Sequence, residues 1–231
     1  MADVEKIKHL LDSLTDDQCR EILEHLRDRV PIHPIEAKLN TRAEVILEAI
    51  DRASDLTLRG VRGIIAEAAF AIGVVSKLEG WREVSLSSDM PYDFLLEDAV
   101  GQVRVQVKMQ RRVSGRPMRA SEASRLLSPD MFVVETQRTR GGVDRSTGED
   151  TRPYRFGEFD LIAVSMHPST NDWDSFMYTV GNWLLPRQDN PILLMKFQPV
   201  SPEPNEDWTS DFLTCVSWLR SGKKKRIRSL S

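Results

Sequence analysis

The chain has 231 residues, of which 40% are hydrophobic and 29% are charged, and its formal net charge is -3. This length accommodates one domain, or one domain with a small helical appendage, and is sufficient to bury a sizeable core. The net charge excludes a protein that is basic overall, so any surface that attracts nucleic acid must be local. The cysteines, Cys19 and Cys215, are isolated, which excludes a disulfide framework or a cysteine metal cluster and favours a reducing compartment.

The sequence predicts neither secretion nor membrane insertion. Residues 1–18 are too charged for a secretory signal. No apolar run approaches the roughly 20 residues that a membrane span requires. We therefore expect a soluble, cytoplasmic protein without a membrane partner.

Residues 3–29 have the pattern of two helices. Apolar residues recur at helical spacing from Val4 to Leu14, and Thr15-Asp16-Asp17 has the composition of a helix start. Pro31 and Pro34 then end the pattern. We expect residues 1–40 to form an N-terminal helical element, used for dimerisation or simply packed on the main domain, and residues 41–231 to form the main domain.

The main domain is expected to begin with helices and to continue with short strands. Helices are predicted over residues 42–53 and 62–78. Segments rich in β-branched and large apolar residues predict strands over residues 84–86, 92–96, 103–108, 131–135 and 161–165. This order predicts an α/β fold with a mixed central sheet flanked by helices. The long polar loops at residues 110–119 and 137–155 have the length of functional or mobile segments, and residues 223–228 form a basic tail.

The segment from residue 90 to residue 112 combines a hairpin pattern with polar residues at fixed positions. Asp93 precedes an apolar run, and Gly101 indicates the hairpin turn. Side chains alternate along residues 103–108, so Arg104, Gln106 and Lys108 share one face and three valines share the other. If the two strands pair, Asp93 reaches the same end of the sheet as Gln106.

These residue types suit phosphodiester hydrolysis. Asp93, the side chain of Gln106 and the backbone carbonyl of Val107 supply oxygen atoms, which Mg²⁺ prefers as ligands. Lys108 would place an ammonium group beside the attacking water and the phosphate. Glu67 falls within the apolar stripe of residues 62–78, where an ionised carboxylate is costly unless it is paired or binds a metal.

The order of a helical glutamate, Pro91-Tyr92-Asp93 and Gln106-Val107-Lys108 resembles the PD-(D/E)xK nuclease superfamily. It looks like the branch in which glutamine replaces the second acidic residue, with one residue inserted into the PD element. The resemblance implies a nuclease domain of that fold. Its implied catalytic residues are Glu67, Asp93, Gln106 and Lys108, and its implied Mg²⁺ ligands are Asp93, Gln106, Val107 and Glu67.

Each of these residues, taken alone, also has a structural interpretation. Asp93 would be a turn residue at a strand end, Lys108 a solvated charge and Gln106 an exposed strand residue. Glu67 would pair with a core arginine such as Arg104. The joint spacing favours the functional interpretation.

Arginine and glutamine side chains gather in and around the two polar loops. Such side chains bind backbone phosphates and can form paired hydrogen bonds with guanine and adenine edges. For the second loop, base recognition and simple solvation both remain open. The candidate DNA-binding residues are Arg104, Gln110, Arg111, Arg112, Arg116, Arg119, Gln137, Arg138 and Arg140.

The resemblance implies a type II restriction endonuclease that cleaves double-stranded DNA at a specific sequence with Mg²⁺. One active site per chain implies a homodimer, which suits a palindromic site. A DNA methyltransferase acting on the same site would be a further partner, which the sequence does not decide. The alternatives are a homing endonuclease, a structure-selective repair or junction nuclease of the same superfamily, and a noncatalytic DNA-binding protein on this fold.

Overall fold

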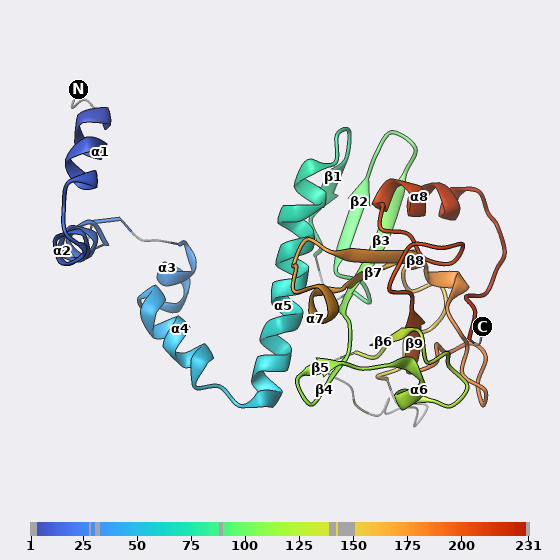
Figure 1. Ribbon diagram of the computed structural model, residues 1–231. Helices are drawn as coiled ribbons and strands as arrows, with labels where there is room; N and C mark the ends of the chain where they lie inside the picture. The colour runs from blue at the N-terminus through green and yellow to red at the C-terminus, as the bar shows by residue number, and fades with distance from the viewer. Residues whose placement is uncertain are drawn as a thin grey trace. The chain divides into compact units, whose positions relative to one another are not determined.

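The computed structural model describes residues 4–27, 29–30, 33–87, 90–138, 142 and 151–229 (Figure 1). The chain divides into two compact units, Met1–Leu58 and Arg59–Ser231. The sequence interpretation put the division after residue 40, whereas the first unit also contains the helices that follow it. Among the described residues, no helix combines the length and the apolar character that crossing a membrane requires.

The first unit consists of short helices without a buried side chain in its described part. They are α1 (Val4–Asp12), α2 (Asp16–Arg27), α3 (Ile35–Leu39) and α4 (Ala43–Asp51). Thr15 and Gln18 form a reciprocal capping box at the start of α2. Arg27 forms an ion pair with Glu44, which links α2 to α4. The apolar side chains of these helices, such as Leu10 and Leu47, stay exposed.

The second unit is built on a mixed five-stranded sheet, as the sequence predicted. Its strands follow the order β1-β2-β3-β7-β8. β3 pairs in parallel with β7, and the other neighbours are antiparallel. The bounds are Arg82–Val84 for β1, Phe94–Glu97 for β2, Gln102–Met109 for β3, Leu161–Ser165 for β7 and Phe176–Val180 for β8.

Asp98 and Gly101 stabilise the turn of the β2–β3 hairpin. Gly101 has a φ of 151°, which favours glycine, and the Asp98 carboxylate accepts hydrogen bonds from the Val100 and Gly101 amides. Arg220 also forms an ion pair with Asp98. The register pairs Glu97 with Gln102 and Phe94 with Val105, so the residue before β2 lies opposite Gln106.

Smaller elements surround the sheet. The predicted strand at residues 131–135 lies outside the central sheet, since β6 (Phe132–Glu135) pairs with β9 (Phe197–Val200). The first polar loop contains the short pair of β4 (Arg112–Val113) and β5 (Arg116–Pro117). The remaining elements are η1 (Val75–Lys77), α6 (Ala120–Ala123), α7 (His167–Thr170) and η2 (Gly181–Trp183).

Two helices contribute to one aromatic core with the sheet. α5 (Asp55–Gly73) runs beside the strands in Figure 1, and α8 (Phe212–Arg220) follows the last strand. The Phe70 ring of α5 is fully buried, and its centroid lies 5.1 Å from that of Phe94, 5.6 Å from Phe176 and 6.0 Å from Phe212. This cluster fixes the rotation of α5 about its axis, and thereby decides which of its side chains face the sheet.

The buried face of α5 differs from the stripe that the sequence suggested. Ile64 and Ile72, which defined that stripe, are 65% and 72% exposed, whereas Ala66 and Phe70 are buried. The apolar residues of α5 cover more than one face, and of the predicted stripe Ala71 and Val75 pack on the core whereas Ile64 and Ile72 do not. The position of Glu67 therefore needs an explanation from the structure itself.

Candidate active site

The hairpin brings Asp93 against Gln106 and Val107. The Asp93 amide donates to the Val105 carbonyl at 3.0 Å, which continues the β2–β3 ladder by one residue. The carboxylate Oδ2 accepts a 2.7 Å hydrogen bond from the Val107 amide and a further one from Gln106 Nε2. Gln106 is 1% exposed. The structure thus places side by side the three residues whose oxygen atoms the sequence singled out.

Lys108 and Glu67 belong to the same electrostatic cluster as Asp93. Burial lowers the pKa of Lys108, and the nearby charges of Asp93 and Glu67 oppose that shift. Burial raises the pKa of Glu67, and the charge of Asp93 raises it further. Burial also raises the pKa of Asp93, against the effects of Lys108, the Val107 amide and Gln106.

The three shifts have one cause, which is the removal of charged groups from water. An acid in such a place holds its proton more tightly and a base holds it less tightly. Two carboxylates and one ammonium that are perturbed together are typical of functional sites rather than of ordinary surface ion pairs. The described residues therefore contain one concentrated set of perturbed charges at the end of β2 and along β3.

Glu67 reaches the cluster because of its position relative to the buried side of α5. It follows the buried Ala66 and precedes the buried Phe70 by three positions, which puts it beside the face that packs on the sheet. The sequence interpretation selected Glu67 from a stripe that is only partly buried. Its position follows instead from the packing of Phe70, three residues further along α5.

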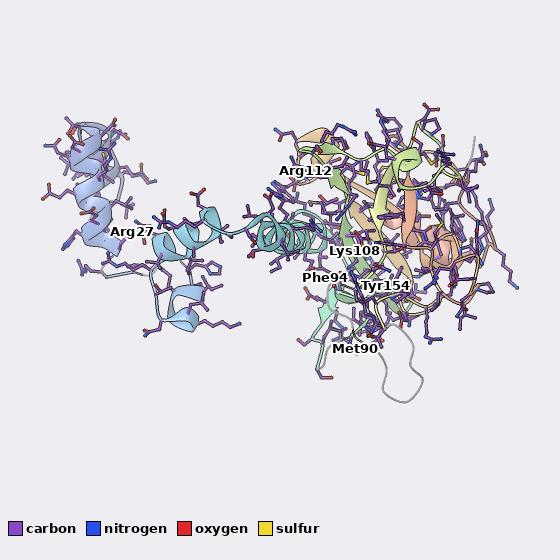
Figure 2. All side chains as sticks on the ribbon, turned by 90° about the horizontal axis from the view of Figure 1, so that it is seen from below. Arg27, Met90, Phe94, Lys108, Arg112 and Tyr154 are labelled. Atoms are coloured by element: carbon purple, nitrogen blue, oxygen red, sulfur yellow. The ribbon has the colours of Figure 1, made fainter. Side chains whose placement is uncertain are left out.

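Tyr154 also faces the site, and the sequence analysis did not select it. Figure 2 labels Lys108 and Tyr154, and the Lys108 Nζ lies 5.4 Å from the centroid of the Tyr154 ring. Arg138 lies over the same ring at 5.5 Å, and Phe159 contacts it edge-on. Burial and the charge of Asp93 raise the pKa of the Tyr154 hydroxyl group. One sequence feature could have indicated Tyr154. It is an aromatic residue shortly before β7, and β7 is the parallel neighbour of β3.

The oxygen donors of this cluster fit Mg²⁺. They are the carboxylates of Asp93 and Glu67, the amide oxygen of Gln106 and the carbonyl of Val107. Mg²⁺ typically takes one or two carboxylates and completes its shell with water and phosphate, whereas Zn²⁺ prefers histidine and cysteine. Among the described residues, no group of three or more His, Cys, Asp and Glu side chains is arranged to hold an ion, so neutral oxygens are needed here.

Gln106 holds its amide nitrogen toward the other donors. Nε2 donates to Asp93 and, at 3.2 Å, to the Val107 carbonyl. An ion bound by Asp93 and Val107 would require the Gln106 oxygen in that place. A half-turn of the side-chain amide exchanges its nitrogen and oxygen with little other movement.

Two residues predicted to bind DNA, Arg104 and Gln110, contact other parts of the second unit. Asp160 accepts hydrogen bonds from the guanidinium and the amide of Arg104, and the Gly157 carbonyl accepts a further one at 2.7 Å. This interaction ties β3 to the segment before β7. Gln110 directly follows β3 and forms a β-bridge with Val134 of β6. Its side chain is completely buried. In this arrangement the Arg104 guanidinium is bound by Asp160 and Gly157, and the Gln110 side chain is buried.

The other predicted DNA-binding residues divide into paired and more accessible side chains. Arg111 pairs with Glu135, Arg116 with Glu122 and Arg138 with Glu158. Arg119 lies over the Phe132 ring, and Arg112 donates to the Gly115 carbonyl. Gln137 bridges to Pro153 through its backbone and is partly exposed. Arg140 lies outside the described residues.

Comparison with known proteins finds a likeness among solved structures. No family model matches the chain, and no curated protein matches it. Among solved structures, the chain is similar to the bacterial homing endonuclease I-Ssp6803I, with 18% sequence identity and a TM-score of 0.39. The likeness covers 73% of this chain and 96% of that protein.

Proposed function

We propose that the protein is a Mg²⁺-dependent endonuclease of the PD-(D/E)xK type that hydrolyses phosphodiester bonds in double-stranded DNA. The observation that carries this proposal is the cluster of Asp93, Glu67 and Lys108 beside the Gln106 side-chain amide and the Val107 carbonyl. A partly buried cluster with two acids and only one base is costly to maintain, which favours a role in binding a cation.

In this proposal the oxygens of Asp93, Gln106 and Val107 hold the ion, and Glu67 binds it directly or through water. When bound, Mg²⁺ would activate water and neutralise the charge that develops on the phosphate. Lys108 directs its ammonium group toward the reacting phosphate, where it orients the water or stabilises negative charge. Tyr154 covers the ammonium group with its ring and limits the directions in which it can move.

We further propose that the protein is a type II restriction enzyme, which cleaves DNA at a specific sequence and acts as a homodimer. Each chain holds one such cluster in its described part, and cleavage of both strands then calls for two chains. The first unit exposes apolar side chains on each of its helices, which suits pairing with a second copy. A methyltransferase acting on the same site would be the companion enzyme.

The test is cleavage of mixed genomic DNA by the purified protein, with Mg²⁺ and with a chelator. Discrete Mg²⁺-dependent bands support the restriction enzyme, and cleavage of only a long asymmetric site or a branched substrate supports the homing or junction nuclease. Lys108→Met should abolish cleavage and leave DNA binding nearly intact, since its role lies in the transition state. Lys77→Met, at an exposed lysine, is the matched control.

Binding without cleavage under every metal condition would reject the enzymatic proposal. It would instead assign the fold to a noncatalytic DNA-binding protein. Cleavage that survives in Lys108→Met would remove Lys108 from the site.

A further inference from the structure

A groove in the second unit is lined by cations and apolar side chains. Its volume is about 960 Å³, and every charged side chain among the described residues that line it is basic. We call it the tail groove, because the basic end of the chain forms one wall. Its charged residues are Arg155, Lys223, Lys224, Lys225 and Arg226.

The basic tail is held by contacts with the rest of the second unit. Lys225 forms a 2.6 Å ion pair with Asp207. Arg226 donates to the Asn182 carbonyl at 2.8 Å and lies over the ring of Phe156. Ile227 is buried, so its neighbours cannot detach without exposing an apolar side chain. The positions of the preceding lysines are therefore fixed by the fold.

Lys223 and Lys224 differ from the cations that follow them. Both side chains are exposed. Within the part of the chain that the structure describes, neither is joined to a carboxylate by an ion pair, whereas Lys225 and Arg228 each have one. The backbone beneath them is held, because Trp183 Nε1 donates to the Lys223 carbonyl at 2.9 Å. Two positive charges thus stand at the groove without a carboxylate partner among the described residues.

The tail groove begins close to the proposed active site. Residues 154–156 pair with residues 192–194, through bonds from the Leu194 amide to the Tyr154 carbonyl and from the Phe156 amide to the Ile192 carbonyl. Tyr154 and Phe156 are two residues apart, so their Cα atoms lie within roughly 7 Å of each other. The Tyr154 ring covers Lys108, and Phe156 lines the groove. One short ribbon therefore connects the two places.

We propose that the tail groove binds the phosphate backbone of the DNA beside the cleaved bond, through Lys223 and Lys224. This inference rests on the proposed function, since the adjoining site would act on the same DNA. A duplex carries a phosphate charge for roughly every 1.7 Å of its axis, so DNA in the active site continues past neighbouring cations. Contacts of this kind hold the DNA in register without reading its sequence.

The experiment measures the salt dependence of DNA binding by the full-length protein. A fluorescent duplex is titrated in chelator, so that no cleavage occurs, over a series of salt concentrations. The logarithm of the affinity falls with that of the salt concentration by about 0.9 per phosphate contact. Replacing Lys223 and Lys224 together with alanine should therefore make the slope shallower by about 1.8, if each lysine neutralises one phosphate.

Matched variants separate this site from a general charge effect. The control replaces Lys77 and Arg125, which are exposed and lie outside the groove, with alanine. It should keep the wild-type slope. Thermal melts of both variants should match the wild type.

Three results would overturn the inference. The first is a wild-type slope in the lysine pair, and the second is an equal loss in the control. The third is competition by an acidic peptide as effective as by unlabelled duplex, which would assign the groove to a protein partner. A wild-type protein that neither binds nor cleaves DNA would instead defeat the proposed function, and the inference with it.

Discussion

Two substitutions of Tyr154 separate the contribution of its ring from that of its hydroxyl group. The side chain is 4% exposed and its ring covers the Lys108 ammonium group at 5.4 Å. A cation over an aromatic face gains about 0.5 to 2 kcal/mol, with the larger value where water is excluded. If the ring holds the ammonium group for the transition state, Tyr154→Leu should lower the single-turnover cleavage rate by about 2- to 30-fold.

Tyr154→Phe keeps the ring and should retain the rate to within about twofold. The matched control is Phe159→Leu, which removes the edge-on ring contact at 5.4 Å but leaves the Tyr154 ring over Lys108. The assay is rapid-quench cleavage with protein in excess over DNA, alongside urea unfolding of each variant. The reasoning is refuted if Tyr154→Phe is as slow as Tyr154→Leu, or if Phe159→Leu is equally slow at matched stability.

Three further predictions concern the site and the fold. Gln106→Glu should retain partial cleavage. In a Mg²⁺ titration it should reach half its maximal rate at a lower Mg²⁺ concentration, because a carboxylate oxygen replaces a neutral one. Complete loss of cleavage at every Mg²⁺ concentration would argue against a role of Gln106 as a ligand. Phe70→Ala should lower the free energy of unfolding by about 3–5 kcal/mol in urea, since a fully buried ring would leave a cavity, and a change below about 1 kcal/mol would contradict the packing described. Arg220 holds the pKa of Asp98 well below its ordinary value, so the pair stabilises the fold at neutral pH and this contribution fades as the pH falls below about 4. The stability difference between wild type and Asp98→Asn should therefore narrow in acid, and a difference that stays constant down to pH 2 would refute the ion-pair explanation.

The central part of the site was predictable because it depends on local pairing. Alternation along residues 103–108 assigns Gln106 and Lys108 to one face, and the turn at Gly101 sets the register. Once the register is set, Asp93 must lie opposite Gln106. All of these contacts join residues within one hairpin, so no information from the rest of the chain was needed.

The reason for the position of Glu67 was not available from the sequence. α5 carries apolar residues on several faces, and Ile64 and Ile72 resemble core residues as closely as Phe70 does. Phe70 is buried because its ring packs against those of Phe176 and Phe212. Both lie more than a hundred residues further along the chain. Helical periodicity reports that a helix has an apolar face, but tertiary contacts decide which face is buried.

For the arginines, too, tertiary contacts decided what the sequence pattern could not. Arg104 and Arg138 looked equivalent as candidates for DNA contacts. Their carboxylate partners, Asp160 and Glu158, are separated from them in sequence by 56 and 20 residues. An ion pair with so distant a partner leaves no local pattern, so composition could identify basic segments but not the cations that remain available.

The parallel pairing of β3 with β7 determines where the Tyr154 ring and the tail groove lie relative to the candidate site. Because parallel strands need a crossover, the chain between them forms β6 and returns through residues 153–160. That return places Tyr154 against Lys108, Asp160 against Arg104 and Phe156 at the groove. The hairpin supplies Asp93 and Lys108 and α5 supplies Glu67, whereas the crossover places the Tyr154 ring over Lys108 and connects the site to the basic tail. A nuclease on this sheet would therefore depend on residues far from its sequence motif for both the position of its lysine and the hold on its DNA.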